Sequence, residues 1–266
     1  MGGEDNNFGI DSIFKNYIKN HLQKIGLINF SSFISVLKII LFDMVPTSII
    51  YRTIHIRNNG ATGSCFILDV NKKQYYITAN HVINGLETGD FLELNYKEDW
   101  NKHKITIVGH SKDSDISVFS VPTGIIGGES IDASSNDVFY SQDIYFLGFP
   151  FGLKSEIASL NSDFPIPFIK KGILSNFIIE KQKKVLYLDG MNNPGFSGGP
   201  VIYFHQQSQT FKLAGIISAY RFQVENAIQN NQEINVQIKT NTGIIISYGI
   251  EVALELIRAN PIGVPI

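Results

Sequence analysis

The chain has 266 residues, of which 44% are hydrophobic and 17% are charged, and its net charge is −2. This is an ordinary globular composition with ample material for a core, in one large domain or two small ones. A net charge so close to zero excludes an electrostatic case for binding nucleic acid or an anionic membrane.

The only cysteine is Cys65, which excludes an intrachain disulfide and favours a reducing compartment. The N-terminus is acidic and polar, without the basic start and apolar run of a secretory signal. The longest apolar stretch, residues 33–45, contains Lys38 and Asp43 and is too short to span a bilayer. We therefore expect a cytoplasmic protein with no membrane span.

Two helices are expected first along the chain. Apolar residues recur at spacings of three and four over residues 10–25, which predicts an amphipathic helix. A second helix, apolar nearly all round, is predicted over residues 32–43 and is closed by Pro46. Together they form a helical N-terminal extension, residues 1–44, which either packs on the rest of the chain or docks a protein partner.

The pattern then changes to short strands rich in β-branched and aromatic residues. Six are predicted before a linker at residues 122–137, and five follow it before a polar, exposed insertion at residues 221–242. Two antiparallel six-stranded barrels are favoured, because closure removes exposed edges. We expect the first barrel at about 45–122, the second at about 137–249, and a C-terminal helix at about 251–258. The predicted strands are 48–56, 63–70, 74–78, 91–96, 104–108, 116–121, 144–147, 172–180, 184–188, 200–204 and 211–218; short pieces at 236–238 and 244–247 can also pair.

Three motifs carry the chemistry, in the chain order His, Asp, Ser. The most specific places Ser197 in a turn with glycine on both sides, between two predicted strands. Glycine tolerates positive φ, so this backbone can bend tightly enough for two N–H groups to converge on an oxyanion. The motifs are Thr78-Ala79-Asn80-His81-Val82, Asp115-Ile116-Ser117-Val118 and Asn193-Pro194-Gly195-Phe196-Ser197-Gly198-Gly199-Pro200.

These motifs and others in the chain resemble the trypsin-like, chymotrypsin-fold serine peptidases, nearest the Deg/HtrA style without a PDZ domain. The resemblance covers roughly residues 45–260 and implies a mainly β double barrel. The other motifs are Gly63-Ser64-Cys65-Phe66-Ile67, Leu147-Gly148-Phe149-Pro150-Phe151-Gly152-Leu153, Lys171-Gly172-Ile173-Leu174-Ser175 and Leu213-Ala214-Gly215-Ile216-Ile217-Ser218.

The catalytic roles follow from what each group needs. Ser197 Oγ is a weak nucleophile and requires an adjacent base, and His81 can accept and return a proton near neutral pH. Asp115 would fix the imidazole tautomer, with Asp113 as the competing carboxylate. The backbone N–H groups of Gly195 and Ser197 would form the oxyanion hole. The plainer alternatives are a structural turn serine and a core histidine.

Substrate contacts are expected at two places. The resemblance implies that the residue six before the nucleophile lies at the base of the primary pocket. That residue is Met191, which favours a pocket for uncharged, small to medium apolar side chains, and the plainer alternative is a core methionine. Ser218, Ala219 and Tyr220 would form the pocket wall and pair with the substrate backbone. Phe196 departs from the family, where Asn or Asp usually precedes the serine, so activation by a freed N-terminal amine is not expected.

The predicted function is a serine endopeptidase acting through an acyl-enzyme, regulated or activated by a partner. No cofactor or metal is expected, and the partners are a polypeptide substrate and a protein bound through the N-terminal helices. The alternative is a catalytically silent protease fold that serves as a scaffold or binding module.

Overall fold

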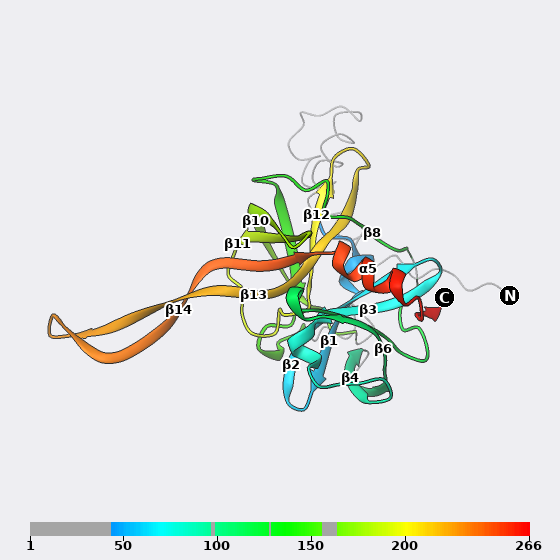
Figure 1. Ribbon diagram of the computed structural model, residues 1–266, viewed down its shortest axis with the longest axis horizontal. Coiled ribbons are helices and arrows are strands. Elements are labelled where there is room, and N and C mark those ends of the chain that lie inside the picture. The colour runs from blue at the N-terminus through cyan, green and yellow to red at the C-terminus, as the bar shows by residue number, and fades with distance from the viewer. Residues whose placement is uncertain (1–43, 97–98, 128, 156–163) are drawn as a thin grey trace, which may run out of the picture.

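The computed structural model describes residues 44–96, 99–127, 129–155 and 164–266. The predicted helices at 10–25 and 32–43 lie outside these residues. The described chain is mainly β, as predicted, and its strands form two curled sheets with a short helix near the C-terminus (Figure 1).

The first sheet has the strand order β5-β4-β1-β2-β3-β7-β6, with β15 paired to β3. It closes at Ile105, which separates β5 from β6, because this residue exchanges backbone hydrogen bonds of 2.9 Å with Gly89 and Asp90. β5 and β6 thus act as two halves of one bent strand, which gives the predicted six-stranded barrel. The strands are β1 (Thr53–Asn58), β2 (Ala61–Val70), β3 (Lys73–Ala79), β4 (Phe91–Tyr96), β5 (Asp99–Lys104), β6 (Thr106–Ser111), β7 (Ile116–Ser120) and β15 (Val264–Pro265).

The second sheet has the order β12-β9-β10-β11-β14-β13-β8, and a further pairing of β12 with β13 closes six of its strands into a ring. The predicted linker at 122–137 contains β8, which pairs parallel with β13. The strands are β8 (Asp132–Ala133), β9 (Asp143–Gly148), β10 (Phe168–Glu180), β11 (Lys183–Asp189), β12 (Pro200–His205), β13 (Thr210–Gln229) and β14 (Gln232–Gly249).

Alternation of apolar and polar residues explains how these strands bury one face. In β4, Leu92 and Leu94 are buried while Phe91 and Glu93 are not. Each barrel has its own apolar core, and a third cluster fills the seam between them. That cluster joins Phe66 of the first barrel to Leu213 of the second.

Five short helices complete the described fold. The predicted strand at 48–56 is wrong at its start, because Thr47–Ile50 forms α3 directly after Pro46, whose φ of −63° suits a helix start. The predicted C-terminal helix is confirmed as α5 (Glu251–Ala259), which packs against β6 and β7. The other three are the 3-10 turns η1 (Asn80–Ile83), η2 (Lys112–Ser114) and η3 (Pro150–Gly152).

The predicted insertion at 221–242 is exposed, but it is not irregular. β13 and β14 continue through it as one long hairpin that projects from the second barrel (Figure 1). Its tip is the pair Asn230 and Asn231, with φ of 51° and 60°. Asparagine tolerates this left-handed conformation, which a two-residue hairpin turn requires.

Candidate active site

His81 and Asp115 meet at the edge of the first barrel. His81 lies in η1, directly after β3, and Asp115 lies between η2 and β7 with a φ of 46°. The two oxygens of Asp115 hold His81 at two points. Oδ2 lies 2.7 Å from the ring Nδ1, and Oδ1 accepts the His81 backbone N–H at 2.9 Å. The carboxylate therefore fixes both the position and the orientation of the imidazole.

A third group reaches the same carboxylate from the second barrel. Ser218 Oγ donates to Asp115 Oδ2 at 2.6 Å. Burial is the largest influence on the Asp115 pKa and raises it, but the hydrogen bonds from His81 and Ser218 outweigh burial. The net pKa of Asp115 lies below its ordinary value, which keeps the carboxyl ionised beside the imidazole. The sequence analysis places Ser218 only on the substrate wall, because no local pattern marks a bond to a residue 103 positions away.

Ser197 lies at the seam of the two barrels. Its backbone oxygen accepts the Ser64 N–H of the first barrel at 2.7 Å, and its Oγ donates to the Ser218 backbone oxygen at 3.3 Å. Gly198 is required beside it, because its φ is +84° and a Cβ there would lie 2.0 Å from the Ser64 oxygen. Ser218 thus contacts both Ser197 and Asp115.

The backbone before Ser197 is fixed by the segment that follows β9. The Pro194 oxygen accepts the Phe151 N–H at 2.7 Å, and the Gly195 oxygen accepts Ser64 Oγ at 2.7 Å. In a trans peptide the C=O and the following N–H point in opposite directions, so the Gly195 N–H points away from Phe151. Within the described residues, neither the Gly195 N–H nor the Ser197 N–H donates a hydrogen bond. Both predicted oxyanion donors are therefore available to a ligand.

Phe196 takes the place of the usual polar residue by packing into the core. Its side chain is fully buried and meets Phe146 edge to face, with ring centroids 5.2 Å apart. Lys170 supports the same turn, since its Nζ lies 5.3 Å from the Phe196 ring and donates to Asn193 Oδ1 at 3.0 Å. The sequence analysis did not single out Lys170, a single strand lysine whose contacts arise only through the tertiary fold.

The predicted substrate contacts lie on two segments, Met191 after β11 and residues 218–220 on β13. Met191 is half exposed, and its backbone oxygen accepts Lys170 Nζ at 2.6 Å. Ala219 is exposed and Tyr220 is half-buried, next to Ser218 on β13. Their roles in binding substrate stay predictions.

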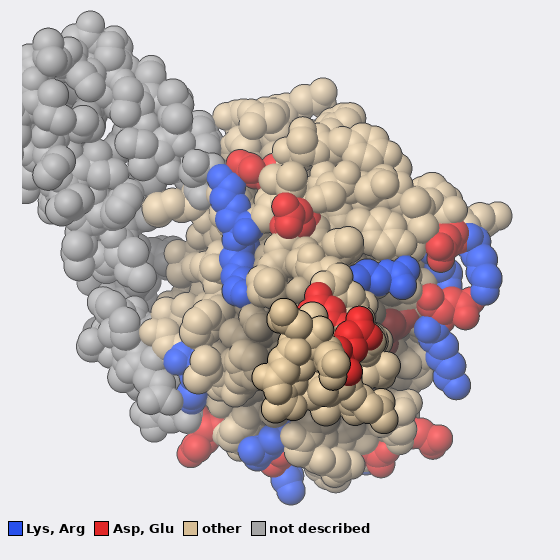
Figure 2. All heavy atoms as spheres, turned by 90° about the vertical axis from the view of Figure 1, so that its left-hand side faces the viewer, with Lys and Arg blue, Asp and Glu red and all other residues tan. Residues whose placement is uncertain are grey.

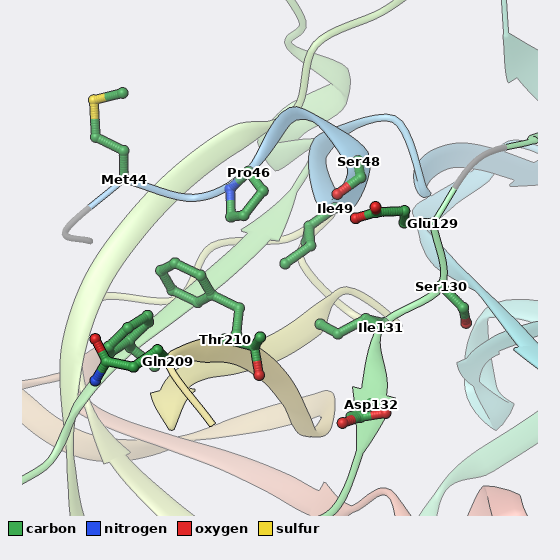
Figure 3. A pocket seen from close by; sticks show the side chains of 12 residues that line it. Met44, Pro46, Ser48, Ile49, Glu129, Ser130, Ile131, Asp132, Gln209 and Thr210 are labelled. Atoms are coloured by element: carbon green, nitrogen blue, oxygen red, sulfur yellow. The ribbon is translucent and has the colours of Figure 1, made fainter. Parts of the chain in front are cut away.

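A cavity of about 340 Å³ lies elsewhere, between α3, β8 and the turn from β12 to β13 (Figure 3). Ile49, Ile131 and Phe211 supply apolar walls. None of the predicted catalytic residues lines it. In the described part of the chain, no group of three or more His, Cys, Asp or Glu side chains is placed to hold a metal ion. Nor does any described helix have the length and apolar character needed to cross a membrane.

Comparison with solved structures supports the double-barrel fold. AlgW, an HtrA-type protease solved with a tripeptide, and its serine-to-alanine variant are each 18% identical to this chain, with a TM-score of 0.54. Each match covers 80% of this chain and 61% of the AlgW chain, so this chain spans less than two thirds of AlgW. A serine-to-alanine mutant of Rv3671c from M. tuberculosis H37Rv, in an inactive form, is 13% identical with a TM-score of 0.51, and the match covers 81% of this chain and 89% of that one.

No curated protein matches the sequence closely enough to count as a relative. A family model described as the trypsin-like peptidase domain, however, matches residues 63–208, which is more than half of the chain. That range contains His81, Asp115 and Ser197. The chain therefore belongs to the trypsin-like peptidase family.

Proposed function

We propose that this protein is a serine endopeptidase that cuts polypeptides through an acyl-enzyme on Ser197. His81 serves as general base and then general acid, and Asp115 orients it. Membership of the trypsin-like peptidase family supports serine protease chemistry in general.

One observation carries the residue assignment. Ser218 links the three groups, because its Oγ donates to Asp115 while its backbone oxygen accepts Ser197 Oγ. Since Asp115 also holds the ring of His81, nucleophile, base and carboxylate share one small region at the seam of the barrels.

The proposed chemistry begins when Ser197 Oγ attacks the scissile carbonyl carbon and its proton passes to the free ring nitrogen of His81. The oxyanion accepts hydrogen bonds from the Gly195 and Ser197 N–H groups, each worth roughly 3 kcal/mol in the transition state. The C–N bond then breaks as His81 returns the proton to the leaving amine. Water, activated by His81, hydrolyses the acyl-enzyme and frees Ser197.

A second candidate is a silent protease fold used as a binding module. It is favoured by the hydrogen bond of Ser197 Oγ to the Ser218 backbone oxygen, because no described hydrogen bond joins this hydroxyl to His81. In catalysis the hydroxyl must turn from Ser218 toward the imidazole.

Labelling with a fluorophosphonate distinguishes the two candidates. An assembled site labels on one serine, and labelling disappears in Ser197→Ala but persists in Ser208→Ala, a control on the exposed turn between β12 and β13. Cleavage of an unfolded protein such as casein should follow the same pattern. Absence of both labelling and cleavage in the wild-type chain would favour the silent module.

The proposal extends to regulation and location. We expect a partner that binds the predicted N-terminal helices to control the site, and the substitution Ile18→Glu in the full chain should then change the labelling rate measured with that partner. A cytoplasmic location is proposed from the single cysteine. Cys65 is buried and unpaired, and burial raises the pKa of its thiol, so oxidation of this thiol is disfavoured.

A further inference from the structure

The hairpin formed by residues 221–242 of β13 and β14, here called the arm, is the most unusual part of the described fold. It projects well beyond the second barrel (Figure 1). A two-stranded ribbon is only marginally stable alone in water, so further pairing would stabilise it.

One edge of the arm is the outer continuation of the edge of β13 that lies beside Ser197. On that edge β13 pairs with β12 as far as Ile216, and Ile217 adds backbone bonds of 2.8 and 2.9 Å to Gly198 and Gly199. At the next residue Ser197 Oγ meets the Ser218 oxygen. Beyond it, no described strand pairs with this edge of β13, which stays open from residue 218 to residue 229.

We propose that the substrate strand predicted against residues 218–220 continues outward along the arm, so that residues 222–226 of β13 pair with substrate residues further upstream of the scissile bond. The inference rests on the proposed function, since Ser197 sets where the scissile bond must lie. A substrate strand that took the place of β12 beyond Ser197, on the same edge of β13, would lie against residues 218–229. If it is antiparallel like β12 and β14, its N-terminal part runs outward along the arm.

The regular part of the edge defines which substrate residues the arm would hold. The Arg221 oxygen is taken by Thr242 Oγ1 at 2.9 Å, and a bulge separates Tyr220 from Phe222. From Phe222 to Asn226 the register with β14 is uninterrupted. At one substrate residue per residue of β13, counted from Ser218, these positions correspond to roughly the fifth to the ninth residue before the scissile bond.

The side chains along this run indicate the chemistry of the bound segment. Phe222 and Val224 lie on one face of β13 and are 53% and 49% exposed. The charged residues of the arm are Arg221, Glu225, Glu233 and Lys239, which sum to zero. The view along the arm shows a largely uncharged surface with a few acidic side chains (Figure 2). An extended, uncharged segment with alternating apolar side chains would fit this edge best.

The edge is also unprotected against pairing over its regular run. Natural edge strands are blunted by lysine, proline, bulges or short length. Bulges flank residues 222–226 on both sides, but within this run β13 has neither lysine nor proline and its register with β14 is unbroken. Exposed apolar side chains on a long open edge are a hazard unless the edge has a partner. A bound substrate strand would be such a partner for this edge.

The test measures binding without catalysis, in the full chain carrying Ser197→Ala. Two fluorescein-labelled peptides share their last three residues, Ala-Ala-Val, and the longer one has six further upstream residues that alternate valine and threonine. A third peptide carries the same six residues downstream instead. We expect the upstream extension to tighten binding about tenfold in fluorescence anisotropy, and the downstream extension to have no such effect.

Two matched substitutions assign the gain to one edge. Val224 on β13 and Val236 on β14 are 49% and 51% exposed, so either can accept a charge without disturbing the core. Val224→Asp should abolish the tenfold gain while Val236→Asp retains it, and Val224→Lys repeats the test with the opposite charge.

Three outcomes would overturn the inference: no gain from the upstream extension, an equal response of the two valine variants, or a sedimentation experiment in which Val224→Asp dissociates a homo-oligomer. The last would show that a second copy occupies the edge. Fluorophosphonate labelling reports separately on the proposed function, so a silent site and an unused arm give different results.

Discussion

His55 is a buried histidine with no polar partner, and it should make the fold sensitive to acid. It is 3% exposed on β1, and neither ring nitrogen has a hydrogen bond within the described residues. The ring stacks on Phe149 at 4.8 Å and meets Trp100 at 4.7 Å. Burial first, and then the charges of Lys154 and Arg57, lower its pKa to about 4. The folded protein therefore holds this ring neutral.

The size of the effect follows from linkage. The unfolded chain binds the proton near the ordinary pKa of 6.5, whereas the folded chain binds it only near about 4. As pH falls through this window, protons bind the unfolded state more strongly than the folded state. The free energy of unfolding therefore decreases. The difference of pKa corresponds to roughly 3 kcal/mol once pH is below both values, and to roughly 2 kcal/mol between pH 8 and pH 5.

The substitution His55→Phe isolates this contribution, because it keeps an aromatic ring on Phe149 and removes the titrating group. At pH 8 we expect the unfolding free energies of variant and wild type, measured in urea, to differ by an amount that reflects packing alone. At pH 5 the variant should gain about 2 kcal/mol relative to wild type beyond that difference. A difference in unfolding free energy that stays constant from pH 8 to pH 5 would refute the reasoning.

Three further substitutions test the packing and the site. Gly195→Ala should abolish fluorophosphonate labelling, because φ is +106° and the new Cβ would lie 2.2 Å from the Phe149 oxygen; labelling at the wild-type rate would contradict the turn geometry. Arg52→Ala should destabilise the fold by about 3–5 kcal/mol in urea unfolding. Arg52 Nη2 lies 2.6 Å from Asp69 Oδ2, so the substitution leaves a buried carboxylate without its cation. A loss below about 1 kcal/mol would show that water reaches the carboxylate. Ser218→Ala should slow labelling about tenfold while peptide binding is kept, as expected for loss of one hydrogen bond to an ionised group; an unchanged rate would remove its side chain from the site.

The strands of both barrels can largely be predicted from the sequence, because their signals lie within short stretches of neighbouring residues. Period-two burial, as in β4, and Asn-Gly turns, as between β1 and β2, depend only on neighbouring residues. α3 was missed because four residues are too few to show a helical period. β8 was missed because two residues paired in parallel carry no pattern of their own.

The arm shows the opposite difficulty. Its sequence does alternate, with Ile234, Val236 and Ile238 separated by polar residues, yet the Asn and Gln content of the segment indicates an exposed loop. Alternation normally reports burial of one face, and here the apolar residues stay about one third to one half exposed. The strands form through pairing with each other rather than through a core, so a burial-based prediction finds the exposure and misses the structure.

The candidate site likewise has a part that the sequence predicts and a part that only the fold shows. The motifs around His81, Asp115 and Ser197 are local in sequence and could be recognised one by one. The contacts that connect them are not local: Ser218 reaches Asp115 across the seam, and the Ser64 N–H donates to the Ser197 oxygen. Both bonds require the two barrels to be docked, and each barrel buries its own core independently of them. Predicting the site as a whole therefore requires the packing of the seam, where one apolar cluster includes Phe66 of the first barrel and Leu213 of the second.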